Sequence, residues 1–136
     1  MKRRGLREQI FKLLFRADFH EAAEMEEQMD LYFDSGDQTV SEEDRALIRQ
    51  KVLAVMDCIP ALDEGLEKTM EGWTMARVGR VEKAILRLAA YEIDHDEEVP
   101  LGVAISEAVE LAKKFGQDNA ASFVNGVLAR YVKGRE

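Results

Sequence analysis

The sequence predicts an all-α protein built as a single domain. Three observations support this fold class: apolar residues recur at helical spacing over most of the 136 residues, only two prolines interrupt them, and no stretch shows the β-branched alternation of a strand. The composition is 46% hydrophobic and 34% charged. A chain of this length is expected to bury its own core without disulfides or metals.

The first third of the chain predicts two helices of different character. The first is expected from about Arg4 to Phe19 and has a wide apolar stripe made of Leu6, Ile10, Phe11, Leu13, Leu14, Phe15 and Ala17. So wide a face indicates a second contact besides the core. Residues 20–34 are strongly acidic but contain enough apolar positions for a short second helix, and Ser35-Gly36-Asp37 is expected to close it as a turn.

The middle of the chain predicts two helices separated by a break. Ser41 followed by Asp44 is a variant of the capping box and starts a helix that reaches Ile59. Pro60 lacks the amide hydrogen that a helix interior uses, so we expect a break or kink there and a new helix from Pro60 to Met70. The break is expected to separate two packing units.

The only tryptophan lies at the end of that helix, in the segment Gly72-Trp73-Thr74. At such a junction Trp73 is expected to fill a gap in the core, and the alternative is that it stacks on a ligand. A further helix is predicted from about Arg80 to Asp94. An acidic loop follows it, and Pro100 stands where the next helix starts.

Two helices are predicted between Val103 and Tyr131, joined by a turn at Gly116. Gly116 is expected to take the positive φ that ends a helix, and Asp118 or Asn119 is expected to cap the next one. The apolar side of the last helix is interrupted by Asn125-Gly126. A polar group and a bare backbone there are unusual for a helix that only packs in a core.

The chain carries no motif for catalysis, a metal or a cofactor. It has no glycine-rich phosphate loop and no nucleophile turn, and His20, His95 and Cys58 lack metal-ligand spacing. Cys58 is the only cysteine and is expected in the core. No segment has the character of a secretory signal or the roughly 18 apolar residues of a membrane span, so we expect a soluble, cytoplasmic protein that is not an enzyme.

Charge is unevenly distributed along this acidic chain, whose formal net charge is -8. The first 16 residues contain six Lys or Arg against one acid, whereas residues 17–44 contain eleven acids and neither Lys nor Arg. Cations at a helix start oppose the helix dipole, which favours a functional reason for them. Arginine offers forked donors to phosphate. Two interpretations of Lys2, Arg3, Arg4 and Arg7 remain open, a nucleic-acid contact and a solubilising tail.

Five stretches match the pattern of one known family in order and spacing. They are Arg3-Arg4 with Arg7-Glu8, Val81-Glu82-Lys83-Ala84-Ile85-Leu86-Arg87 with Tyr91-Glu92, Val99-Pro100, Ala104 through Gly116, and Phe123-Val124-Asn125-Gly126-Val127-Leu128. Together they cover nearly the whole chain, and the last two are specific. The chain thus resembles the bacterial transcription antitermination factor NusB family. The resemblance implies about seven helices in two packed helical subdomains, at roughly residues 1–70 and 71–136.

The resemblance also implies a function and the residues that perform it. Members of the family bind the boxA element of ribosomal-operon leader RNA together with NusE, a small-subunit ribosomal protein, so that RNA polymerase passes terminators. Members are found as monomers and as homodimers. The RNA-facing positions correspond here to Lys2, Arg3, Arg4, Arg7, Asn119 and Phe123. The NusE-facing positions correspond to Phe15 and Glu82, and Phe15 lacks the hydroxyl of the tyrosine often found there.

Two other interpretations of the sequence are open. The acidic composition and the wide apolar face of the first helix also fit a helical protein-interaction module without RNA binding. Replacing Arg3, Arg4 and Arg7 with Ala separates the two, since only an RNA-binding protein loses RNA affinity. The chain also resembles the RNA-binding domain of some rRNA methyltransferases, although it has no room for a cofactor-binding fold. For Phe123 itself, an ordinary core position is the alternative to a stacking role.

Overall fold

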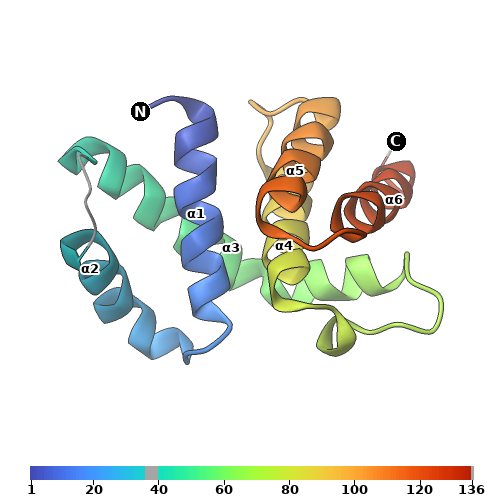
Figure 1. The fold of residues 1–136 in the computed structure, drawn as a ribbon, viewed down its shortest axis with the longest axis horizontal. Coiled ribbons are helices and arrows are strands. Elements are labelled where there is room, and N and C mark those ends of the chain that lie inside the picture. Colours follow the sequence, from blue (N-terminus) through green and yellow to red (C-terminus); the bar gives the residue numbers. More distant parts are fainter. Residues whose placement is uncertain (36–39, 136) are drawn as a thin grey trace. The chain divides into compact units, whose positions relative to one another are not determined.

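The computed structural model describes residues 1–35 and 40–135, and these residues form helices and turns without a strand. The elements are α1 (Arg3–Ala17), the 3-10 helix η1 (Ala22–Glu24), α2 (Met25–Ser35), α3 (Glu42–Glu67), the 3-10 helix η2 (Met75–Arg77), α4 (Arg80–His95), α5 (Leu101–Phe115) and α6 (Ala120–Lys133) (Figure 1). The all-α prediction is confirmed, and the described part contains six α-helices where about seven helices were expected. The turn predicted at Ser35-Gly36-Asp37 falls largely outside the described residues.

The chain divides into two compact units inside α3. The N-terminal unit is Met1–Asp57 and the C-terminal unit is Cys58–Glu136. None of the described helices has the length and apolar character that crossing a bilayer requires. Each unit has its own buried residues and is described separately below.

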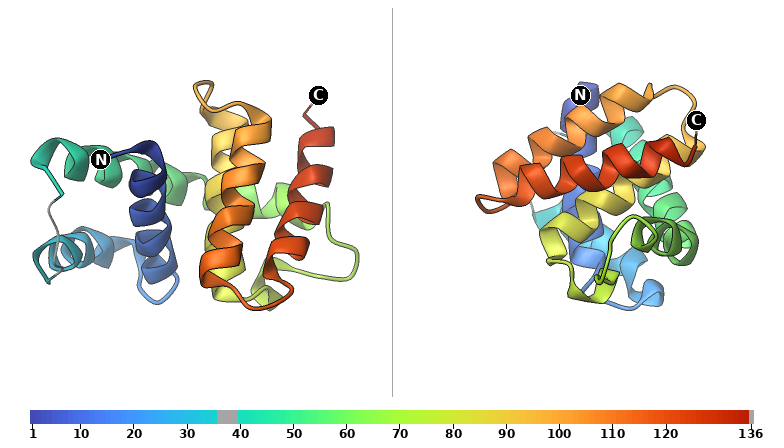
Figure 2. Two further views of the ribbon diagram at one scale, coloured as in Figure 1. Left: turned by 45° about the horizontal axis from the view of Figure 1, so that its top comes forward. Right: turned by 90° about the vertical axis from the view of Figure 1, so that its right-hand side faces the viewer.

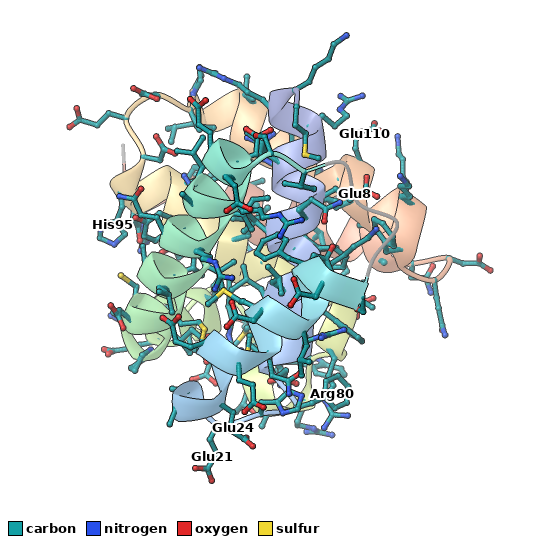
Figure 3. The ribbon with its side chains drawn as sticks, turned by 90° about the vertical axis from the view of Figure 1, so that its left-hand side faces the viewer. Glu8, Glu21, Glu24, Arg80, His95 and Glu110 are labelled. Atoms are coloured by element: carbon teal, nitrogen blue, oxygen red, sulfur yellow. The ribbon has the colours of Figure 1, made fainter. Side chains whose placement is uncertain are left out.

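The N-terminal unit buries one face from each of its three helices. The buried apolar residues are Ile10, Phe11, Leu13 and Leu14 of α1, Met25, Met29 and Phe33 of α2, and Val40, Ile48, Val52 and Val55 in and before α3. Polar contacts join the helices around this core. The Arg49 guanidinium pairs with Asp30 of α2 and lies 5.3 Å from the centre of the Phe33 ring. At the start of η1, Glu21 donates its backbone N–H to the Glu24 carboxylate at 2.8 Å, and both are labelled in Figure 3.

The predicted break at Pro60 is wrong, because α3 continues through it to Glu67. Pro60 is exposed, so the Met56 carbonyl one turn earlier, which the proline cannot bond, lies on the same solvent side. Water can satisfy that carbonyl at little cost. The predicted start of the helix is confirmed, since Ser41 Oγ accepts the Asp44 backbone N–H at 3.1 Å.

The C-terminal unit is built on α4, α5 and α6, which pack against one another (Figure 2). Its buried residues recur at three- and four-residue steps and include Ala84, Ile85, Leu88 and Ala89 of α4, Ala104, Ala108, Leu111 and Ala112 of α5, and Val124, Val127, Leu128 and Tyr131 of α6. The last turns of α3 join this bundle through Asp63, which accepts two hydrogen bonds from the Arg87 guanidinium at 2.9 and 2.6 Å. The predicted helices from Arg80 onward are therefore confirmed.

A polar cluster fastens the ends of α4 and α6. The buried Tyr131 hydroxyl donates a hydrogen bond to the Asp94 carboxylate, and the Arg135 guanidinium donates to Asp94 at 2.7 Å while lying 3.5 Å above the Tyr131 ring. Burial raises the pKa of Tyr131 far above its usual value, and the bond to Asp94 adds to this rise. Partial burial alone raises the pKa of Asp94, but hydrogen bonds from Arg135 and Tyr131 outweigh it, so the net pKa is lowered.

Candidate functional site

The basic residues at the start of α1 do not share one environment. Lys2, Arg3 and Arg4 are exposed, whereas Arg7 is buried with only 9% of its surface accessible. The Met1 amino group donates to the Asp44 carboxylate at 3.1 Å, which holds this end of α1 against the start of α3. Three of the four predicted RNA-binding cations are thus accessible to a partner, and Arg7 is buried.

Phe15, the predicted NusE-facing residue of α1, belongs to a row of aromatic rings. It is partly exposed, and its ring lies edge-on to that of Phe19 with 5.4 Å between ring centres. Phe11 lies on the other side at 6.5 Å and is buried. Phe19 is 52% exposed. The wide apolar stripe predicted for this helix is therefore real, and its C-terminal end reaches the surface.

A pocket of about 890 Å³ lies in the C-terminal unit, where the start of α4, the η2 turn and the turn between α5 and α6 meet. We call it the α4–α6 pocket; it is lined by Trp73, Arg77, Val78, Gly79, Glu82, Gln117, Asp118, Asn119, Ala120 and Phe123. Its volume is within the range of roughly 300–1,000 Å³ that small-molecule sites occupy. Three residues predicted to be functional, Glu82, Asn119 and Phe123, meet here.

The Glu82 carboxylate occupies a space that the missing side chain of Gly79 leaves open, and it lies within ordinary contact distance of Gly116. A Cβ at Gly79 would overlap this carboxylate, and a Cβ at Gly116 would lie 3.5 Å from it. Glu82 stands in the first turn of α4, where a negative charge is favoured by the helix dipole. The carboxylate therefore lies between the start of α4 and the end of α5, on the wall of the pocket and close to backbone.

Gly116 forms this turn through close packing, and the predicted positive φ is wrong. Its φ is -92°, and the only positive φ among the described residues is that of Gly72, at 74°. An added Cβ at position 116 would overlap the Ala120 side chain and lie 2.8 Å from the Ala112 carbonyl oxygen. The sequence analysis thus identified the right residue for the wrong reason. The turn requires a residue without a side chain at position 116, not a positive φ.

The start of α6 presents Asn119 and Phe123 on the pocket side. Asn119 is the exposed N-cap residue, and its side chain makes no capping hydrogen bond, contrary to one of the two predicted caps. Ala120 and Val124 are buried and fix the register of the helix. Phe123 is therefore left partly exposed, and the alternative that its ring is an ordinary core residue is wrong.

Trp73 was expected to fill the core, and this prediction is wrong because 51% of its surface is exposed. The local backbone keeps the Trp73 side chain exposed, through the conformation of Gly72 and the contacts of Met75. Gly72 turns the backbone with a positive φ, and the buried Met75 donates its backbone N–H to the Glu67 carboxylate at 2.7 Å. The Arg77 guanidinium then lies 5.2 Å from the centre of the Trp73 ring, within the distance for a cation–π contact.

The lining of the pocket defines which chemistry it can perform. It offers two aromatic rings, the side-chain amides of Gln117 and Asn119, one guanidinium and two carboxylates. Among the residues that the structure describes, no cluster of three His, Cys, Asp or Glu side chains is arranged to hold a metal. The arrangement suits recognition of a flat, polar-edged group by stacking and hydrogen bonds.

The chain is similar to known proteins over nearly its full length. The family model described as the NusB family matches residues 4–133. The transcription antitermination protein NusB of Lachnoclostridium phytofermentans is 44% identical over 132 residues, which are 97% of this chain and 99% of that protein.

The chain belongs to the NusB family.

Solved structures of this family have the same fold. NusB from T. maritima superposes with a TM-score of 0.85 at 29% identity, covering 98% of this chain and 92% of that one. A crystal structure of the antitermination factors NusB and NusE in complex with dsRNA superposes with a TM-score of 0.78 at 25% identity, covering 97% of this chain and 96% of that one. The resemblance inferred from the sequence motifs is confirmed.

Proposed function

We propose that this chain is a transcription antitermination factor that binds the boxA element of ribosomal-operon leader RNA together with NusE. Membership of the NusB family over residues 4–133 is the observation that carries the proposal. Support also comes from the related crystal structure that contains NusB, NusE and double-stranded RNA. In this proposal the chain is a noncatalytic scaffold of the cytoplasm, where nascent transcripts are made.

The proposed RNA-binding residues fall into two groups with different environments. Lys2, Arg3 and Arg4 offer exposed cations to phosphate, and Arg7, one turn further along α1, is a buried member of the proposed group. Asn119 and Phe123 line the α4–α6 pocket and offer an amide and an aromatic ring to an unpaired base.

The proposed NusE-binding residues are Phe15 and Glu82. Phe15 contributes a partly exposed ring next to Phe19, so apolar burial replaces the hydrogen bond of a tyrosine hydroxyl. Glu82 shares the α4–α6 pocket with Asn119 and Phe123. A partner that contacts Glu82 therefore lies beside the RNA, and each ligand is expected to tighten binding of the other.

The test is a binding titration of boxA RNA in the presence and absence of NusE. We expect NusE to tighten RNA binding by about 5- to 150-fold, the range of coupling energies between linked sites. Affinity should fall steeply as salt rises, because phosphate contacts release counterions. Equal affinity for boxA RNA and for a scrambled RNA of the same composition would contradict the proposal.

The same titration tests the alternative of a protein-interaction module. Exposed Phe19, Leu31 and Leu47 in the N-terminal unit favour a protein partner. A chain that binds NusE but binds no RNA, with or without NusE, would support this alternative.

Two further partners belong to the proposal: the antitermination complex of RNA polymerase and, as an alternative to a monomer, a second copy of the chain. Antitermination acts on elongating polymerase, so read-through of a terminator in a purified transcription reaction is the measurement for the first. Sedimentation of the chain at several concentrations measures the second.

A further inference from the structure

We propose that Trp73 and Arg77 form a stacking site for one unpaired nucleobase in the α4–α6 pocket. The inference rests on the proposed RNA-binding function and adds a recognition element to it. Trp73 and Arg77 come from the turn between α3 and α4, a segment separate from the helix starts that supply the other proposed RNA-binding residues.

The exposure of Trp73 is built into the local structure. Tryptophan is the largest side chain, and leaving half of its surface in water forgoes the burial free energy that the ring would gain in a core. The two neighbours that hold it outside, Gly72 and Met75, are fixed by a left-handed backbone and by a hydrogen bond to Glu67. Val78, three residues after Met75, is buried as well. The ring is thus presented at the surface by a turn that begins at Gly72 and is anchored after the ring by the buried Met75 and Val78.

The Arg77 guanidinium over the Trp73 ring favours a neutral, flat ligand over a cationic one. Its guanidinium carbon lies 5.2 Å from the centre of the Trp73 ring and occupies the position that a cationic ligand would take. A lysine or arginine from a protein partner would be repelled by this existing cation. A nucleobase carries no charge and can stack on an indole ring or on a guanidinium plane.

The remaining lining of the pocket favours a base over a phosphate. Glu82 and Asp118 contribute two negative charges against the single positive charge of Arg77, so the charged side chains of the lining disfavour an anion. Gln117 and Asn119 each offer an amide donor and an amide acceptor, the groups that read base edges. Phe123 adds a second ring on the same lining. The proposed site therefore binds the base and leaves the phosphate to residues outside the pocket.

The chain provides its own reporter for this site, because Trp73 is its only tryptophan. Titrating the whole chain with single-stranded boxA RNA should quench the tryptophan emission at the same RNA concentration at which binding occurs. RNAs in which one base at a time is removed to leave an abasic sugar locate the stacked nucleotide. We expect one abasic position to abolish the quenching while the RNA still binds.

Substitutions at position 73 measure the contribution of stacking. Trp73→Leu should weaken RNA binding by about 5- to 150-fold, equivalent to 1–3 kcal/mol per stacked base, and Trp73→Phe should recover most of the loss. The loss should be the same at low and high salt, because no phosphate contact is removed. Trp73→Leu should not weaken binding further when the RNA carries the critical abasic position, since the two changes remove one interaction.

Arg77→Gln should weaken binding by about two- to fivefold, the size of an exposed cation–π contact. Arg80→Gln is the matched control, since Arg80 is also exposed but does not line the pocket (labelled in Figure 3). Equal losses in the two variants, with equal reductions of the salt slope, would make Arg77 a phosphate contact and overturn its role in stacking. Thermal unfolding monitored by circular dichroism verifies that each variant is folded.

The outcomes separate this inference from the proposed function. If wild-type chain binds boxA RNA while Trp73 emission stays constant and Trp73→Leu binds as well as wild type, the stacking site is refuted and the proposed function stands. If NusE alone changes the emission and Trp73→Leu weakens NusE binding only, the pocket is a protein contact and the inference is wrong. If no RNA binds even with NusE, the proposed function fails and the stacking site fails with it.

Discussion

The start of α1 and the α4–α6 pocket are the two proposed RNA-binding regions, and they offer different chemistry. The start of α1 presents exposed cations on an open helix end. The pocket is lined by two aromatic rings and by more acidic than basic side chains. Binding through α1 should depend strongly on salt and little on bases, and binding through the pocket should do the reverse. The comparison indicates that the start of α1 attracts the RNA backbone, whereas the α4–α6 pocket determines which nucleotide binds there.

The largest expected effect comes from Gly116→Ala, which should damage the pocket and leave the start of α1 unchanged. The added Cβ overlaps Ala120 and lies 2.8 Å from the Ala112 carbonyl oxygen. Overpacking of this kind costs about 1–3 kcal/mol. We expect urea unfolding to show this loss, and we expect RNA binding to retain its full salt slope while losing Trp73 quenching.

Gly126→Ala is the control for that variant. An added Cβ there meets only the Arg130 guanidinium, at 3.6 and 3.9 Å, both ordinary contact distances. Gly126 lies inside α6, where alanine is the better helix former by about 0.5–1 kcal/mol, so this variant should be as stable as wild type or more stable. Equal destabilisation by both substitutions would show that close packing at Gly116 is unimportant.

The double substitution Arg3→Gln with Arg4→Gln tests the other region. Each cation removed from a phosphate contact should reduce the slope of log affinity against log salt by about 1, so this double variant should reduce it by about 2. RNA affinity should fall by about tenfold at low salt. Stability should not fall, because both residues are exposed and their positive charges oppose the dipole at the start of α1. Filter binding at four salt concentrations measures the RNA affinity and its salt slope.

Lys68→Gln with Lys113→Gln is the matched removal of two charges. Both lysines are exposed and pair, among the contacts described, only with a glutamate three or four residues earlier in the chain, at 3.8 Å for Lys68 and 3.6 Å for Lys113. This control should keep the wild-type salt slope. An equal change of slope in both double variants would mean that overall charge, and not the start of α1, attracts the RNA.

Tyr131→Phe should weaken the C-terminal unit while leaving both RNA-binding regions intact. The Tyr131–Asp94–Arg135 cluster joins the ends of α4 and α6, whereas the pocket is formed at their starts. Removing the buried hydroxyl should lower the free energy of unfolding by about 1 kcal/mol. RNA affinity at a temperature well below unfolding should equal that of wild type. A lower affinity would show that the Tyr131 cluster at the ends of α4 and α6 affects RNA binding at their starts.

The pH dependence of this variant follows from the two pKa shifts. The pKa of Asp94 is lowered in the folded chain, so its stabilisation is present above the usual carboxyl pKa of about 4 and is lost as the pH falls below that value toward the lowered pKa. The pKa of Tyr131 is raised, so wild type loses stability as the pH rises above about 10. Tyr131→Phe should lose less stability than wild type as the pH rises above about 10, and the loss that remains includes that from Tyr32, whose pKa burial also raises. Urea unfolding at pH 3, 7 and 10.5 checks the acid and alkaline sides.

The smallest expected effect is that of Phe15→Tyr on NusE binding. The added hydroxyl sits on a partly exposed ring next to Phe19 and can gain one hydrogen bond to the partner. Such a bond contributes about 0.5–1.5 kcal/mol, which is roughly a two- to tenfold tighter complex. Calorimetric titration with NusE measures it. A weaker complex would show that the apolar ring is the feature this interface requires.

The helices of the C-terminal unit were predicted well because their apolar residues follow a clear period. Arg80 begins α4 as expected, and Leu101 follows Pro100 at the start of α5. The predicted helix break at Pro60 is wrong because the low helix propensity of proline reflects only its effect on the backbone. Its exposed position in α3 makes the missing hydrogen bond cheap, and exposure depends on tertiary packing that a local pattern does not contain.

Only part of the site could be predicted from the sequence, because the rest depends on tertiary contacts. Asn119, Phe123 and Glu82 were predicted through family motifs, and the structure brings them together in one pocket. Trp73 was assigned to the core because large apolar residues are usually buried. Its exposure depends on the contact between Met75 and Glu67, which no local rule predicts. The polar neighbours in Gly72-Trp73-Thr74, with an arginine four residues after the tryptophan, were the available signal.

The packing at Gly116 limits how this turn can change over generations. Every other amino acid has a Cβ, so each missense mutation in this codon puts an atom where Ala120 and the Ala112 oxygen already lie. A compensating Ala120→Gly mutation relieves the first overlap. The second involves main-chain oxygen, which no substitution deletes. Descendants of this chain are therefore expected to inherit the residue unchanged, even where the surrounding helices drift.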